Sequence, residues 1–165
     1  MPKKIRVAAL DDHQGIIDGY LYRLNRSPEV EIVGAATNAA DFENLLTTQA
    51  VDLVFLDVWA PTSADNPNPY PILHFIPKLL EDYPHLAVLV ISAVNERALI
   101  QAVIDAGANG YILKEDTASI QNLAAIVAAV SNGGLHLSPM AGEQFLQRHR
   151  KAGEPSLTPR QLEAL

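Results

Sequence analysis

The chain has 165 residues, 48% of them hydrophobic, which is enough for one domain with a buried core plus a short appendage and excludes a largely disordered chain. Its formal net charge of -7 at pH 7 excludes these residues, taken together, as a surface that neutralises the phosphates of duplex DNA. The absence of cysteine excludes disulfides, thiolate zinc ligands and thiol nucleophiles, and it fits a reducing interior.

The N-terminal segment predicts neither an export signal nor a membrane anchor. Its start, Met1-Pro2-Lys3-Lys4, is basic, but the apolar run that follows is interrupted at Asp11 and Asp12, well short of a signal-peptide core or a membrane span. We therefore expect a cytoplasmic protein with no membrane contact.

Five short apolar runs alternate with helical patterns along most of the chain. The runs are rich in β-branched residues and too short for stable helices, so they predict strands. They cover residues 5–10, 29–35, 52–57, 86–92 and 109–113. The apolar residues at helical spacing that follow them are Ile17, Tyr20, Leu21 and Leu24; Phe42, Leu45 and Leu46; Phe75, Ile76, Leu79 and Leu80; Leu99, Val103 and Ile104; and Ile120, Leu123, Val127 and Val130.

This alternation predicts a (βα)5 fold of the α/β class. Near-continuous apolar strands separated by helices indicate a parallel sheet covered on both faces, with right-handed crossovers. We expect a doubly wound, flavodoxin-like sheet of five strands in the order 2-1-3-4-5, with a ligand site at the carboxyl ends of the strands.

Two segments depart from the alternation. Residues 60–71 combine prolines with Asn and Asp, which predicts a stiff, irregular loop directly after the third strand. The tail predicts a linker helix, a polar hinge at 151–155 and a new helix start, because Thr158-Pro159-Arg160-Gln161 has the pattern of a capping box. We therefore expect a first domain at 1–133, a linker at 134–156 and the start of a second domain at 157–165.

Three carboxylates follow neighbouring strands of the predicted sheet. Asp11 and Asp12 come after the first strand and Asp57 ends the third, so we expect them to share one pocket. Like charges this close repel unless a cation lies among them, and oxygen ligands favour a hard divalent ion, so we expect Mg²⁺. A helix cap would explain Asp12 alone equally well. Asp57 fits that explanation less well, because a polar residue ending a buried strand is costly unless it is used or paired.

Ser92 and Lys114 end the fourth and fifth strands and should project into the same crevice. Alone, a serine after a strand is usually a helix cap, and a lysine is usually a solvated surface charge. Together with the carboxylates they supply what an aspartyl phosphoacceptor needs, namely a nucleophile, a metal site, a fixed cation and a hydroxyl.

These residues lie in four ordered motifs, and on them the predicted first domain resembles the receiver domain of two-component response regulators. The motifs are Leu10-Asp11-Asp12-His13, Phe55-Leu56-Asp57, Val90-Ile91-Ser92-Ala93 and Gly107-Ala108-Asn109-Gly110-Tyr111-Ile112-Leu113-Lys114. The resemblance implies a signalling switch that catalyses only its own phosphoryl transfer and dephosphorylation. Asp57 would accept a phosphoryl group from a sensor histidine kinase, and Lys114 would hold the phosphoryl oxygens.

The resemblance also implies a metal site and a relay. Mg²⁺ would bind Asp12, Asp57 and the backbone carbonyl of Trp59, with Asp11 acting largely through water. Ser92 would move toward the phosphoryl group. Tyr111 would then turn inward to fill the vacated space, although an amphipathic edge strand would explain an aromatic residue there as well.

The tail is similar to the linker and first helix of LuxR/NarL-type transcription factors. The similarity rests on Leu135-His136-Leu137-Ser138-Pro139 and on Leu157-Thr158-Pro159-Arg160-Gln161-Leu162-Glu163-Ala164-Leu165. It implies homodimers formed through receiver helices, and control of transcription through a C-terminal helix-turn-helix domain whose recognition helix is missing here.

The segment after Asp57 departs from the Met-Pro and compact glycine turn usual in receiver domains. Trp59, together with Val94, could shield the acyl phosphate from water, so slow dephosphorylation is a hypothesis. The alternative is a loop that closes over the pocket, in a domain that signals without phosphate.

Three other functions fit these residues less well. A haloacid-dehalogenase-like phosphatase needs a second aspartate where this chain has Trp59. A flavin or nucleotide module needs a phosphate loop after the first strand, where Asp11 and Asp12 would repel phosphate. Cobalamin binding through Asp-x-His-x-x-Gly would need glycine in place of Ile16.

Overall fold

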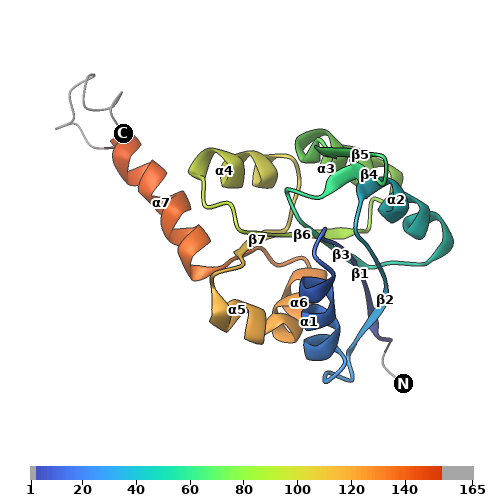
Figure 1. The fold of residues 1–165 in the computed structure, drawn as a ribbon. Helices are drawn as coiled ribbons and strands as arrows, with labels where there is room; N and C mark the ends of the chain where they lie inside the picture. The colour runs from blue at the N-terminus through green and yellow to red at the C-terminus, as the bar shows by residue number, and fades with distance from the viewer. Residues whose placement is uncertain (1–2, 154–165) are drawn as a thin grey trace.

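The computed structural model describes residues 3–153, which form a parallel sheet with helices on both faces (Figure 1). The elements are β1 (Ile5–Leu10), α1 (Gln14–Leu24), β2 (Val30–Ala36), α2 (Ala39–Thr48), β3 (Leu53–Leu56), β4 (Pro61–Ser63), β5 (Asn66–Pro69), α3 (Ile72–Asp82), β6 (Ala87–Ser92), α4 (Arg97–Asp105), β7 (Gly110–Leu113), α5 (Thr117–Gln121), α6 (Leu123–Ser131), β8 (His136–Leu137) and α7 (Pro139–Gly153).

The main sheet runs in the order β2-β1-β3-β6-β7-β8, and all of its pairings are parallel. Its first five strands are the five predicted from sequence, in the predicted order 2-1-3-4-5. The prediction of a doubly wound α/β fold is therefore confirmed, and the short strand β8 extends the sheet beyond it.

Alternate residues of each strand enter separate cores on the two faces of the sheet. In β3, for example, Val54 and Leu56 pack in one core, whereas Leu53 and Phe55 pack in the other. Helices α2, α3 and α4 cover the first face, and α1, α5 and α6 cover the second (Figure 1). Because both faces of the sheet are buried, the strands read as continuous apolar runs in the sequence.

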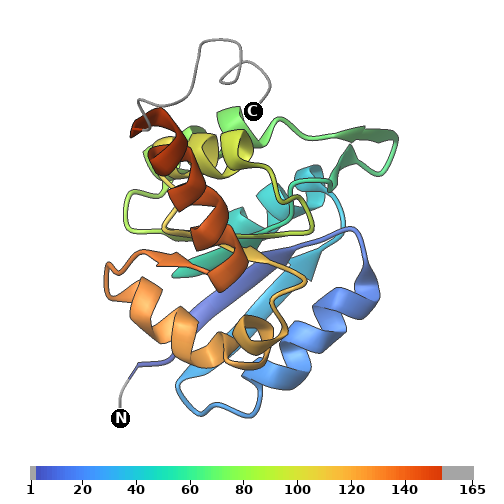
Figure 2. The same ribbon diagram turned by 90° about the vertical axis from the view of Figure 1, so that its left-hand side faces the viewer.

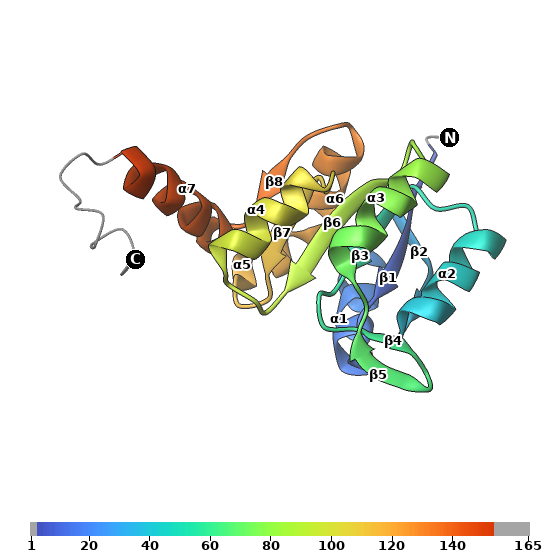
Figure 3. The same cartoon turned by 90° about the horizontal axis from the view of Figure 1, so that it is seen from above.

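The prediction of an irregular loop at 60–71 is wrong, because this segment forms a two-stranded antiparallel hairpin of β4 and β5. Pro61 pairs opposite Pro69, and the Thr62 hydroxyl donates to the Asn68 carbonyl across the hairpin at 2.8 Å. Proline lacks an N–H donor, which excludes it from the middle of a sheet but not from a small hairpin with free edges. Strand β4 packs against α2 rather than joining the main sheet, and Figure 3 shows the hairpin beside that helix.

The fifth predicted helix is divided in two. Asn122 takes a non-helical conformation, with φ of -105° and ψ of 22°, and separates α5 from α6. Asparagine competes with the helical backbone for hydrogen bonds, which favours such a break. Helix α6 ends at Ser131, and Gly133 follows with a positive φ of 90°, which is common just after a helix.

The predicted linker helix is α7, which packs against α4 and β7 (Figure 2). Because α7 continues to Gly153, residues 151–153 of the predicted hinge are helical instead. The rest of that hinge, the capping box at Thr158-Pro159-Arg160-Gln161 and the predicted second domain lie outside the described residues. Among residues 3–153, no helix combines the length and hydropathy needed to cross a membrane.

Candidate functional site

The candidate site lies where four adjacent parallel strands reach their carboxyl ends. Leu10 pairs with Leu56, so Asp11 and Asp57 leave neighbouring strands side by side. Ser92 ends β6 opposite Leu113 of β7, and its carbonyl accepts a hydrogen bond from the Lys114 N–H at 2.9 Å. The order β1-β3-β6-β7 thus brings the predicted residues to one edge of the sheet.

The Lys114 ammonium joins two buried carboxylates. Its Nζ lies 2.8 Å from Asp11 Oδ2 and 3.2 Å from Asp57 Oδ1. Asp11 is fully buried and Asp57 is 3% exposed. Burial lowers the pKa of Lys114, but the hydrogen bonds and charges of both carboxylates outweigh it, so the pKa rises overall and the lysine stays charged.

Asp57 is the carboxylate that this environment perturbs most clearly. Burial and then the negative charge of Asp11 raise the pKa of Asp57 to about 6, against the opposing effect of Lys114. The two buried carboxylates face one ammonium, so their formal charges leave the pocket with room for additional positive charge.

Asp12 lies at the exposed rim of this pocket, beside His13. The Asp12 Oδ1 atom is 3.0 Å from the ring atom Nδ1 of His13. The backbone N–H of His13 donates to Asp11 Oδ1 at 2.9 Å. Ligand atoms of these three residues lie within 4.8 Å of one another. This group contains two of the predicted ligand residues, Asp11 and Asp12, and carboxylate oxygens are the donors that a hard divalent cation such as Mg²⁺ prefers. The group does not include Asp57 or Trp59, which stay predicted ligands.

Ser92 and Tyr111 meet at the backbone of Val94 and are both fully buried. The Ser92 hydroxyl accepts from the Val94 N–H at 3.0 Å, and the Tyr111 hydroxyl donates to the Val94 carbonyl at 2.6 Å. Burial raises the pKa of Tyr111 to about 12, so its hydroxyl keeps its proton. The two predicted relay residues are therefore linked through the loop between β6 and α4.

Tyr70, a residue missed by sequence reasoning, contacts the segment that follows β3. Its hydroxyl donates to the Asp57 backbone carbonyl at 2.8 Å, and its N–H donates to the Ala60 carbonyl at 3.1 Å. Tyr70 is 3% exposed and packs edge-on against Phe75, with ring centroids 5.1 Å apart. Its one sequence signal was an aromatic residue within a proline-rich polar segment. The Trp59 side chain, in contrast, is 56% exposed.

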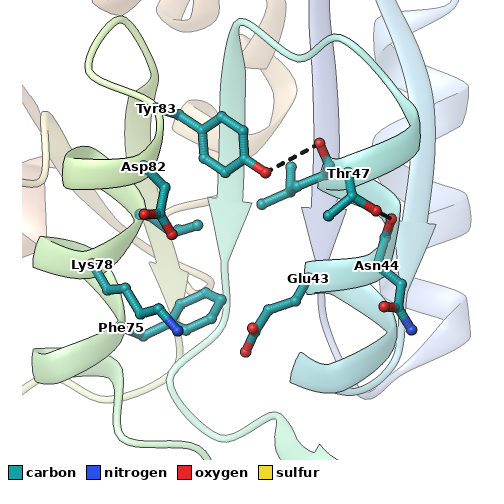
Figure 4. Close-up of a pocket in the computed structure, with 9 residues that line it drawn as sticks. Glu43, Asn44, Thr47, Phe75, Lys78, Asp82 and Tyr83 are labelled. Carbon is teal, nitrogen blue, oxygen red and sulfur yellow. Dashed lines mark hydrogen bonds between the residues drawn. The ribbon is translucent and has the colours of Figure 1, made fainter.

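A second feature, a cavity of about 180 Å³, lies between α2 and α3 (Figure 4). It is lined by Glu43, Asn44, Leu46, Thr47, Phe75, Lys78, Leu79, Asp82 and Tyr83. At its edge the Tyr83 hydroxyl donates to the Leu46 carbonyl at 3.3 Å. None of the site residues predicted from sequence lines this cavity, so we place the chemistry at the strand ends.

Comparison with known proteins agrees with this geometry. The family described as the response regulator receiver domain matches residues 7–128. Curated relatives include the transcriptional regulatory protein DegU of Brevibacillus brevis, 26% identical over 90% of this chain and 59% of that protein. Another is the transcriptional regulatory protein LiaR of Bacillus subtilis, 26% identical over 98% of this chain and 74% of that protein. The chain thus spans only part of the length of these relatives.

Solved structures with the same fold include receiver domains of RcsB. The isolated RcsB domain from Salmonella enterica serovar Typhimurium, determined with the phosphomimetic BeF3-, has a TM-score of 0.74 and 20% identity, covering 86% of this chain and 99% of that one. A structure of two RcsB dimers bound to two parallel DNAs has a TM-score of 0.74 and 19% identity, covering 98% of this chain and 74% of that one.

Proposed function

Because the chain belongs to the response regulator receiver domain family, we propose that it is a phosphorylation-driven switch in which Asp57 accepts the phosphoryl group. Phosphorylation on aspartate is general to this family, whose LuxR/NarL-type members are transcriptional regulators. The observation that carries the assignment is the contact of Lys114 with both buried carboxylates at adjacent strand ends.

In the proposed transfer, a carboxylate oxygen of Asp57 attacks phosphorus while the bond from phosphorus to the histidine nitrogen of a sensor kinase breaks. The kinase histidine leaves with that electron pair. A pKa of about 6 keeps Asp57 mostly ionised at pH 7 and therefore nucleophilic. Lys114, already within hydrogen-bond distance of the acceptor carboxylate, would pair with the phosphoryl oxygens.

Receiver domains generally bind Mg²⁺ at an acidic pocket such as that of Asp11 and Asp12. We assign Asp12, Asp57 and the backbone carbonyl of Trp59 as its ligands, with Asp11 acting through water. When bound, the ion supplies the positive charge that the transferring phosphoryl oxygens need.

The switch itself is assigned to Ser92 and Tyr111. A phosphoryl group on Asp57 offers new hydrogen-bond acceptors, toward which the Ser92 hydroxyl would move. That movement breaks its bond with the Val94 N–H and disturbs the loop to which Tyr111 is bonded. The loop and α4 are therefore the elements that we expect to shift.

The proposed partners are a sensor histidine kinase and a second copy of the chain. Response regulators of this kind receive signals from sensor kinases and bind DNA. We propose a cytoplasmic homodimer with a receiver domain at 1–133, a linker at 134–156 and a helix-turn-helix domain beginning at 157–165, through which DNA would be bound.

Phosphorylation by a small donor tests this function directly. The protein is incubated with acetyl phosphate and Mg²⁺, and its intact mass is measured. We expect a phosphoryl adduct that is lost in Asp57→Asn and kept in the matched variant Asp52→Asn, since Asp52 lies at the other end of β3 and pairs with Arg6. An adduct that survives Asp57→Asn would refute the assignment.

A further inference from the structure

We infer that Tyr70 is a positioning residue for the phosphoacceptor: it clamps the backbone on both sides of Trp59, and thereby sets the geometry of Asp57 and of the proposed metal-binding carbonyl. The inference rests on the proposed function and extends it to the hairpin that replaces the usual compact turn.

The clamp consists of two hydrogen bonds from one residue. The Tyr70 hydroxyl binds the Asp57 carbonyl at 2.8 Å, and the Tyr70 N–H binds the Ala60 carbonyl at 3.1 Å. The short segment between these carbonyls includes Trp59, whose own carbonyl is the proposed ligand. Holding both ends of so short a segment restricts the rotation of every peptide within it.

The hairpin and the core fix Tyr70 itself. Tyr70 directly follows β5, so the pairing of Pro61 with Pro69 brings it back beside Ala60, the residue before β4. Its ring is 3% exposed and packs edge-on against Phe75 of α3. Burial, together with the negative charges of Asp57 and Asp11, raises the pKa of Tyr70 well above its ordinary value, so the hydroxyl remains a donor.

Tyr70→Phe removes the hydroxyl and keeps the ring contact with Phe75. The matched control is Tyr83→Phe, because the Tyr83 hydroxyl also donates to a backbone carbonyl, that of Leu46. Each variant is assayed for Mg²⁺ affinity through the fluorescence of Trp59, which is the single tryptophan of the chain, and for the rate of phosphorylation by acetyl phosphate. The midpoint of thermal unfolding is measured in parallel.

We expect Tyr70→Phe to weaken Mg²⁺ binding and slow phosphorylation roughly 3- to 10-fold, the range for loss of one hydrogen bond, while Tyr83→Phe leaves both unchanged. Values for Tyr70→Phe within twofold of the parent would overturn the inference.

The experiment also distinguishes a variant that fails to fold from a parent that is not phosphorylated. If Tyr70→Phe does not fold in buffer, it is compared with the parent in trimethylamine N-oxide, which favours the folded state. A phosphorylation rate below that of the parent supports the clamp, and equal rates overturn it. A folded parent that takes up no phosphoryl group refutes the proposed function, and with it the role of Tyr70.

Discussion

The charge on Asp57 costs folding free energy that the rest of the chain must offset. The pKa of this carboxyl rises from 3.8 to about 6 on folding, chiefly through burial and the nearby charge of Asp11. Between these two values the folded state binds more protons than the unfolded state, so stability falls as pH rises through this window.

Asp57→Asn removes that cost. At pH 7, without divalent metal, we expect its free energy of unfolding to exceed that of the parent by roughly 1–3 kcal/mol, and the difference to vanish below about pH 4. Urea denaturation of both proteins from pH 4 to pH 7 measures this. Asp52→Asn should show the opposite sign, because its hydrogen bond with Arg6 lowers the pKa of Asp52 and stabilises the fold at neutral pH. Equal stability of the parent and Asp57→Asn across this pH range would contradict a raised pKa of Asp57 in the folded protein.

Among single residues, the charged members of the site could be predicted from the sequence. The tyrosine that binds the backbone beside Asp57 could not. Asp11, Asp57 and Lys114 follow apolar strands whose order is predictable, so their meeting follows from topology. Tyr70 could not be predicted in the same way, because its role depends on how a proline-rich segment turns back on itself. The proposed shielding of the acyl phosphate by Trp59 stays a prediction.

At the scale of elements, α7 is attached to the receiver fold by side-chain bonds to the strand end. The fully buried Ser138 hydroxyl accepts from the Leu113 N–H at 3.0 Å. Asp116, two residues beyond Lys114, accepts from the Met140 N–H at 3.0 Å. The linker helix is therefore anchored directly beside the candidate site.

Ser138→Ala should loosen this attachment. It leaves the buried Leu113 N–H without its acceptor, which we expect to destabilise the fold by roughly 1–3 kcal/mol in urea denaturation. Ser131→Ala is the control, because the Ser131 hydroxyl donates to the Ala128 carbonyl of its own helix. Equal stability of the two variants would show that the Ser138 bond does not anchor α7.

Helices and strands could be predicted where their apolar residues repeat at a regular spacing along the sequence. Strands buried on both faces are apolar throughout, and amphipathic helices repeat at the helical period, so both were found. The hairpin was missed because its exposed residues, such as Asn66 and Asn68, have no buried face and therefore no period. Strand β8 was missed because a pair of residues is too short to show alternation.

In the whole molecule, the two cores lie on opposite faces of one sheet. The carboxyl edge of this sheet is negatively charged. A cation bound there stabilises only the folded state, because the unfolded chain does not bring Asp12 and Asp57 together. At ten times its dissociation constant, Mg²⁺ should add about 1.4 kcal/mol, which raises Tm by roughly 3 to 6 °C in a domain of this size. Thermal unfolding with and without Mg²⁺ measures this, and an equal rise in Asp57→Asn would place the ion elsewhere.

The most direct test of the account is to locate the phosphoryl group in the chain. The protein is phosphorylated with acetyl phosphate and Mg²⁺, reduced with borohydride so that an aspartyl phosphate becomes homoserine, and sequenced by peptide mass spectrometry. We predict homoserine at position 57 and at no other aspartate. Homoserine at Asp11 or Asp12, or a phosphate that resists reduction because it is attached to Ser92, would contradict the central claim.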